Sequence, residues 1–303
     1  MQLFQLPRVE ESDLPLEFVR GVRRLGFSPD GRLLIARTLK GGWLIDTTTE
    51  AVRELWAQRD LASEGSGVGF TPDGTGVIAF TDESAVRVYD VETGTVRREF
   101  RADYFGGVEP GPGGRVVYVV AGGRSQIVRW DPVTGKKRAA FGGHGGGTTL
   151  QLAVSADGNW IAGTNIYEVR LWDLRGGRSP ARATRCIAVQ LGFPPLLALS
   201  ADGLYLAAGR EEQLWIWDLR SDADGPQALA PGPFGGVAFA PTRPLLLHGS
   251  GEDVVFRNPA TGAEVSRLCW GIGPIQSVAF APDGLRCAAG SAAGKVVVWD
   301  VDL

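Results

Sequence analysis

Short apolar runs alternate with polar turns along this chain, and no segment keeps a helical period for long. Val68–Phe70 and Val77–Phe80, for example, flank the turn Thr71–Gly74. Proline fixes φ at the second position of such a turn, Asp favours the third, and Gly accepts the positive φ often needed at the fourth. The pattern predicts hairpins of short strands and an all-β fold.

Two signatures recur at a regular spacing. The first is a turn of the S-P-D-G type, found at Ser28–Gly31, Thr71–Gly74, Ser155–Gly158, Ser200–Gly203 and Ala281–Gly284, with weaker copies at Pro110–Gly114 and Ala240–Pro244. The second is an apolar strand of the W-D type, which ends at Asp46, Asp90, Asp131, Asp173, Asp218, Asn258 and Asp300. The steps between these ends are 44, 41, 42, 45, 40 and 42 residues. Seven units of this period match the four-stranded blades of a β-propeller.

Each unit has room for four strands. The turn joins the first two, the W-D run supplies the third, and a polar turn leads to a fourth such as Thr95–Phe100 or Lys136–Phe141. The fourth strand is the most polar, and its Arg and Lys residues are typical of an outer edge protected from aggregation.

These repeats resemble the WD-repeat propeller family over almost the whole chain, from about Val22 to Asp300. The resemblance implies one domain, residues 1–303, built as a ring of seven four-stranded antiparallel blades around a central channel. It also implies that an N-terminal segment, residues 1–19, joins the C-terminal blade and closes the ring. Leu3–Leu6 and Leu14–Val19 are both apolar enough to supply that strand, and Pro7 and Pro15 divide the two options.

The sequence departs from the family pattern at its buried polar residues. Members often carry a His, a Ser or Thr, an Asp and a Trp that form a hydrogen-bonded tetrad in each blade. Gly143-His144 is the one Gly-His pair in this sequence, and its blade offers Thr164 and Trp172 but Ile166 at the Asp position. Other blades place Glu83, Ser125, Glu212, Glu252 or Ala293 there. We therefore expect no complete tetrad, and stability that comes mainly from packing between blades, with structural roles for His144, Thr164, Trp130, Trp172, Trp217 and Trp299.

Composition narrows the function classes. Hydrophobic residues make up 44% and charged residues 21%, which excludes a disordered chain, and the 43 glycines fit repeated turns. A net charge of −3 disfavours non-specific nucleic-acid binding. Three cysteines without a close pair match neither a disulfide framework nor a zinc site. With no secretory signal or long apolar run, we expect a soluble cytoplasmic protein, and 27 Arg against 4 Lys favours a bacterium with a GC-rich genome.

No catalytic constellation stands out. The repeated Asp residues occupy turns, and two histidines in different units, His144 and His248, give no zinc motif, so His248 is interpreted as a satisfied core residue. The run Gly142–Gly147 resembles a phosphate-binding loop but lacks the following helix. We predict a protein that is not an enzyme and that has no cofactor or metal site.

The loops at one face of the ring are the best candidates for binding, because aromatic residues and Arg are enriched at interface hot spots. The predicted contact residues are Arg20, Lys40, Tyr104, Phe105, Arg124, Tyr167, Arg210, Phe234 and Trp270. We expect a monomeric, non-catalytic scaffold that binds a protein or peptide, with no nucleic-acid or membrane partner. The charges of these loops are mixed, so they indicate neither an acidic nor a basic partner. The alternatives are a propeller enzyme, a binder of a metal or small ligand at the channel mouth, and a regulatory module.

Overall fold

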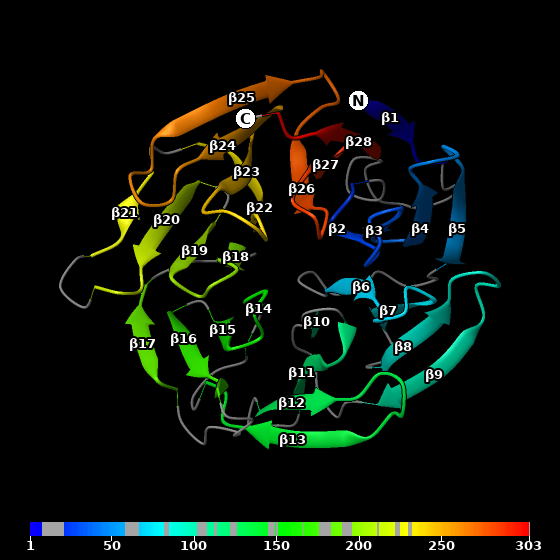
Figure 1. Ribbon diagram of the computed structural model, residues 1–303, viewed down its shortest axis with the longest axis horizontal. Helices are drawn as coiled ribbons and strands as arrows, with labels where there is room; N and C mark the ends of the chain where they lie inside the picture. The colour runs from blue at the N-terminus through cyan, green and yellow to red at the C-terminus, as the bar shows by residue number, and fades with distance from the viewer. Residues whose placement is uncertain are drawn as a thin grey trace.

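A computed structural model describes residues 1–7, 21–57, 67–81, 85–101, 108–111, 114–121, 126–144, 149, 151–165, 167–175, 183–189, 196–210, 212–221, 225–229 and 232–302. In these residues the chain forms seven four-stranded antiparallel sheets, arranged as the blades of a ring (Figure 1). The predicted fold class, a seven-bladed β-propeller, is therefore confirmed.

The blades follow one another in chain order. Blade 1 contains β2 (Arg24–Phe27), β3 (Leu33–Thr38), β4 (Gly41–Asp46) and β5 (Val52–Ala57), and blade 2 contains β6 (Val68–Phe70), β7 (Gly76–Thr81), β8 (Ala85–Asp90) and β9 (Val96–Arg101). Blade 3 contains β10 (Val108–Pro110), β11 (Val117–Ala121), β12 (Gln126–Trp130) and β13 (Lys137–Phe141), and blade 4 contains β14 (Gln151–Val154), β15 (Trp160–Thr164), β16 (Glu168–Asp173) and β17 (Arg185–Ala188). Blade 5 contains β18 (Leu196–Leu199), β19 (Tyr205–Arg210), β20 (Gln213–Asp218) and β21 (Gln227–Ala228). Blade 6 contains β22 (Phe234–Phe239), β23 (Leu246–Ser250), β24 (Asp253–Arg257) and β25 (Glu264–Cys269). Blade 7 contains β26 (Ile275–Phe280), β27 (Arg286–Ser291), β28 (Lys295–Asp300) and β1 (Gln2–Gln5).

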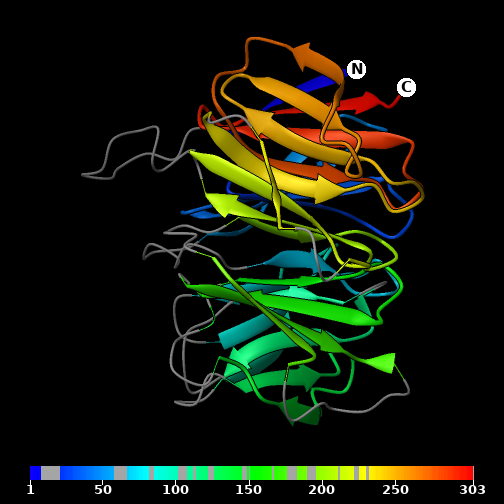
Figure 2. The ribbon, with the colours of Figure 1, turned by 90° about the vertical axis from the view of Figure 1, so that its left-hand side faces the viewer.

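The two ends of the chain share blade 7. Strand β1 is the outer strand of that blade and pairs antiparallel with β28, with Leu3 opposite Val297. Figures 1 and 2 show the two ends lying close together on this blade. The predicted closure by an N-terminal strand is confirmed, and the first of the two candidate segments supplies it.

The hairpin turns have the geometry that their sequences predict. In blade 5, the Ser200 hydroxyl donates to Asp202 Oδ1 (2.6 Å) and accepts from the Tyr205 N–H (2.8 Å). Gly203 has a φ of 70°, in the left-handed region that favours glycine. The same turn in blade 4 uses Ser155 and Asp157 in the same way. Local side-chain chemistry therefore sets where each blade folds back on itself.

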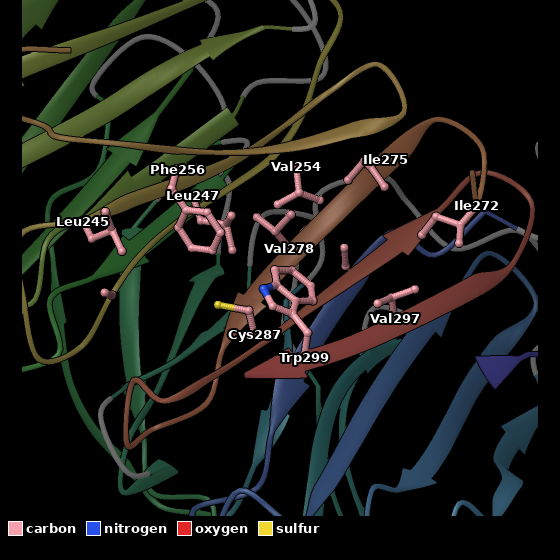
Figure 3. Close-up of a cluster of buried hydrophobic side chains, with 12 residues drawn as sticks. Leu245, Leu247, Val254, Phe256, Ile272, Ile275, Val278, Cys287, Val297 and Trp299 are labelled. Carbon is pink, nitrogen blue, oxygen red and sulfur yellow. The ribbon is translucent and has the colours of Figure 1, made fainter. Parts of the chain in front are cut away.

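The core lies between the blades rather than inside any one of them. The described residues form seven buried clusters, one at each interface between neighbouring blades. Figure 3 shows the cluster between blades 6 and 7, where Phe256 of β24 and Trp299 of β28 meet edge to face at 6.4 Å between ring centroids. Each blade buries apolar surface against both neighbours, so closing the ring removes the last exposed apolar blade faces from water.

Candidate functional site

The antiparallel strand order gives the ring two chemically different faces. The turns within the first hairpin of each blade, and those after the W-D strands, lie on one side, which we call the turn face. The turns between second and third strands, and the loops that enter each innermost strand, lie on the other side, which we call the entry face. The predicted contact residues that the structure describes lie at or near the entry face; they are Lys40, Tyr167, Arg210, Phe234 and Trp270.

On the turn face, the Asp residues of the hairpin turns are engaged locally. Asp30 accepts from the Ser28 hydroxyl (2.5 Å) and from the Arg32 N–H (3.0 Å), and these bonds lower the pKa of its carboxyl. Asp73 makes the equivalent bonds with Thr71 and Thr75. These carboxylates complete the turns, as expected from the sequence.

The Asp residues at the ends of the W-D strands are held in the same way. Asp46 accepts from two backbone N–H groups of its turn and pairs with Arg32 at 2.7 Å; the hydrogen bond from Arg32 is the main reason that the pKa of Asp46 falls to about 2. Further pairs of this kind are Arg97–Asp90, Arg138–Asp131, Arg175–Asp173 and Arg220–Asp218. No group of three or more potential metal ligands occurs in the described part of the chain.

The structure places the predicted residues of the partial tetrad in one blade but connects them differently. His144 is buried and lies edge-on to the Trp172 ring, at 6.0 Å between centroids. Its Nδ1 is bonded to Thr149 Oγ1 (2.8 Å), whereas the Thr164 hydroxyl donates to the backbone carbonyl of Asn165 (2.7 Å). Burial is the main reason that the pKa of His144 falls to about 4, so the ring is neutral at pH 7.

His248 is a satisfied core residue, as its apolar surroundings in the sequence predict. Its Nε2 accepts from Arg257 Nε (2.9 Å), so Nδ1 carries the proton and donates to the Gly249 carbonyl (2.9 Å). Burial lowers the pKa of His248 to about 4. Both nitrogens are occupied within the protein.

The predicted structural tryptophans pack between blades. Trp130 stacks on Phe100 of blade 2 at 5.3 Å between ring centroids. Trp217 belongs to the buried cluster between blades 4 and 5, and Trp299 to the cluster between blades 6 and 7.

The predicted contact residues divide into three groups. Arg20, Tyr104, Phe105 and Arg124 lie outside the described residues. Lys40 in the β3–β4 turn, Tyr167 in the β15–β16 turn and Arg210 at the end of β19 all lie on the entry face. Tyr167 is 65% exposed, and Arg210 forms an exposed pair with Glu212 (3.2 Å).

Two of the predicted aromatic residues face the interior instead. Phe234 is only 6% exposed and packs edge to face on His248, at 5.2 Å between ring centroids. Trp270 is half-buried and packs against Trp299, with ring centroids 4.6 Å apart. The burial of Phe234 leaves no surface with which to contact a partner, and much of Trp270 is covered.

A second feature is the central channel, whose mouth was an alternative site for a metal or small ligand in the sequence analysis, with no lining residues named. The seven innermost strands enclose a cavity of about 580 Å³. Among the described residues that line it, only Arg24 of β2 and Glu109 of β10 are charged. Burial raises the pKa of Glu109 to about 7, against the opposing effect of the Arg24 guanidinium. Glu109 was missed because its unit carries one of the weaker turn signatures, although aligning the seven turns would have located it.

Comparison with known proteins agrees with this geometry. The family described as "WD domain, G-beta repeat" matches residues 267–300, which run from β25 through β28. The other six units share the period of the matched one, and four of them share its Asp-Gly turn. This chain is a WD-repeat propeller. The matched repeat begins in the outer strand of one blade and ends in the third strand of the next, so sequence repeats and blades are offset by one strand. Because of this offset, the outer strand of blade 7 is β1, from the other end of the chain.

The WD-repeat propeller is also similar to a solved structure. A chain of Kuenenia stuttgartiensis hydrazine synthase superposes with a TM-score of 0.73 over 98% of this chain and 99% of that chain, at 18% identity. At this identity the likeness shows the fold alone. No curated protein matches the sequence. Among the described residues, no helix is long and apolar enough to cross a bilayer.

Proposed function

We propose that this WD-repeat propeller is a non-catalytic scaffold that binds a protein or peptide on its entry face. WD-repeat propellers typically serve as platforms for protein interactions. The observation that carries the proposal here is Tyr167, a large aromatic side chain that is 65% exposed in the β15–β16 turn. Exposed aromatic residues of this kind are the usual anchors of protein interfaces.

Tyr167 and Glu168 are hydrogen-bonded locally. Asn165 Oδ1 accepts hydrogen bonds from the N–H groups of both Tyr167 and Glu168, each at 2.8 Å. Arg170 pairs with Glu168 and donates to the Gly143 carbonyl of the preceding loop. Because these hydrogen bonds already hold the backbone at Tyr167, we expect binding through its side chain to cost little conformational entropy.

Charged residues of both signs accompany this anchor. Lys40, Arg210 and Glu212 lie in the corresponding turns of blades 1 and 5 on the same face. Such a rim favours a partner of mixed charge, with the charges governing orientation and the aromatic group supplying most of the affinity.

The test compares single variants in quantitative affinity capture from the source organism. Tyr167→Ala is expected to reduce recovery of the specific partner at least tenfold, and Arg210→Ala to reduce it less. The matched control is Leu285→Ala, which removes a side chain that is 67% exposed on the turn face and is expected to change nothing. Equal recovery with all three variants, at unchanged melting temperature, would place the interface elsewhere and contradict the proposal.

A further inference from the structure

The innermost strands of the ring follow a common rule at one position. In each blade the N–H that closes the first hairpin belongs to the same turn residue, for example Ser28, Thr71 and Gly111. We call the residue two places before it the ring position. It is occupied by Gly26, Gly69, Glu109, Ala153, Ala198, Ala238 and Ala279. Six blades therefore have glycine or alanine where blade 3 has a glutamate.

Close approach of the innermost strands explains the small residues. A Cβ added to Gly69 would lie 2.6 Å from Pro110 Cγ, and one added to Gly26 would lie 3.3 Å from the Val68 carbonyl oxygen. There is no room for a long side chain between such strands, so a glutamate at the ring position has to extend into the channel, whose wall includes Glu109.

Arg24 supplies the opposite charge. It lies two residues before the ring position of blade 1, where blades 4, 5, 6 and 7 have Gln151, Leu196, Gly236 and Ser277. Arg24 and Glu109 flank blade 2, whose innermost strand contributes Val68, Gly69 and Phe70 to the same wall and no charge. The two charged groups act on each other across this gap, since each shifts the pKa of the other.

Among the described residues, the other groups around Glu109 do not neutralise it. Tyr118, opposite Glu109 on β11, has its pKa raised by burial and lies under the Arg129 guanidinium, 5.9 Å from the ring centroid. Strands β6 and β14 contribute no titratable side chain to the described wall, and Arg23 acts on Arg24 from the neighbouring position. Glu109 thus combines a desolvated carboxyl group with the Arg24 guanidinium, in a cavity whose other described lining residues are uncharged.

We propose that the channel binds a small zwitterion, an α-amino acid. Its carboxylate pairs with Arg24 and its ammonium group with Glu109. A plain carboxylate would leave Glu109 beside a second acid, and a plain amine would face Arg24, whereas a zwitterion complements both. The cavity of about 580 Å³ falls within the range of small-molecule sites. This site is separate from the entry-face anchor and does not depend on the scaffold role.

Three probes of one shape test the charge requirement by isothermal titration calorimetry at pH 7.5. L-Leucine carries both charges, N-acetyl-L-leucine lacks the ammonium group, and L-leucinamide lacks the carboxylate. L-Leucine, or L-phenylalanine as a larger zwitterion, is expected to bind at least tenfold more tightly than either single-charge analogue. Absence of binding by both amino acids at 10 mM, or equal binding by N-acetyl-L-leucine, overturns the proposal.

Variants then assign the binding to Glu109. Glu109→Ala installs the residue that four other blades carry at the ring position, so the ring is expected to fold while leucine affinity falls at least tenfold. Glu109→Gln preserves the shape and is expected to lose affinity to a similar extent. Glu252→Gln makes the same chemical change in an exposed turn on the entry face and is expected to bind like the wild type.

The pH dependence gives an independent check. Because Glu109 must ionise to meet the ammonium group and its pKa is about 7, affinity is expected to rise up to tenfold per pH unit from pH 6 towards 7 and then to level off. In Glu109→Ala this dependence should disappear. If Glu109→Ala instead lowers the melting temperature at pH 8 and leaves leucine binding unchanged, the two charges form a structural ion pair and the proposal is wrong.

Discussion

The two faces of this ring differ in how closely the seven blades repeat one another. On the turn face, Asp residues such as Asp30, Asp73 and Asp202 close hairpins through the same hydrogen bonds. On the entry face, the corresponding turns carry residues as different as Lys40, Tyr167 and Glu252. The comparison teaches that repeated local chemistry builds the scaffold from one side, which leaves the other side free to vary and to bind.

As the pH falls, the two faces should lose their contributions to stability in different pH ranges. His144, in the loop before blade 4, and His248, near the entry-face end of β23, are both buried with pKa values of about 4. Their contribution to stability is present above their ordinary pKa of 6.5 and is lost as the pH falls towards 4. Turn-face carboxylates such as Asp46 and Asp218, with pKa values of about 2, keep their contribution until the pH falls below 3.8.

Glu109 opposes the histidines in this range, so removing it should steepen the loss of stability in acid. Its pKa is raised to about 7, so it favours the folded state below 4.5 and this contribution is lost as the pH rises towards 7. Between pH 6.5 and 4.5, two histidines and one glutamate give a net loss of about 1.4 kcal/mol per pH unit. In Glu109→Gln the loss should double to about 2.7 kcal/mol per unit. Urea unfolding at pH 4.5, 5.5 and 6.5 measures both slopes, and equal slopes would show that Glu109 does not titrate here.

Replacing glycines of the same backbone conformation by alanine should cost different amounts of stability on the two faces. Gly203 on the turn face and Gly271 on the entry face have φ values of 70° and 60°. A Cβ at Gly203 would lie 2.3 Å from Trp160 Cδ1, whereas one at Gly271 would meet nothing within 4 Å. Gly203→Ala should cost about 3 kcal/mol from strain and overpacking, and Gly271→Ala about 1 kcal/mol from strain alone. Equal losses in urea melts would mean that the turn face is not the more constrained one.

The same local regularity explains why the fold could be predicted from the sequence. Period, turn residues and polar outer strands are short-range signals, and they located the strands: Val68–Phe70 is β6 as expected. These signals do not distinguish Leu3–Leu6 from Leu14–Val19 as the closing strand, because both segments are apolar. Only the tertiary pairing with β28 distinguishes the first segment.

The candidate site was less predictable because its residues are defined by what surrounds them. Phe234 and Tyr167 are both aromatic residues near entry-face turns, yet one packs on His248 and the other is exposed. Sequence alone does not separate these outcomes. Glu109 escaped notice for another reason: β10 is only three residues long and precedes a turn without the usual Asp, so its alignment with the other innermost strands emerged from the hydrogen bonds.

The smallest predicted effect tests whether the turn chemistry itself is interchangeable between blades. The Ser200 hydroxyl donates to Asp202 and accepts from the Tyr205 N–H at the start of β19. Blade 7 has Ala281 at the equivalent position, and there Asp283 accepts only from the Leu285 N–H (2.9 Å). Ser200→Ala should therefore cost about 1 kcal/mol, the usual value of such a hydrogen bond. Ala281→Ser should recover a similar amount, because the buried hydroxyl finds both an acceptor in Asp283 and a donor in the Arg286 N–H. A double variant that melts like the wild type would show that the turn face uses one exchangeable unit, whereas destabilisation by Ala281→Ser would show that blade 7 has adapted to its missing hydroxyl.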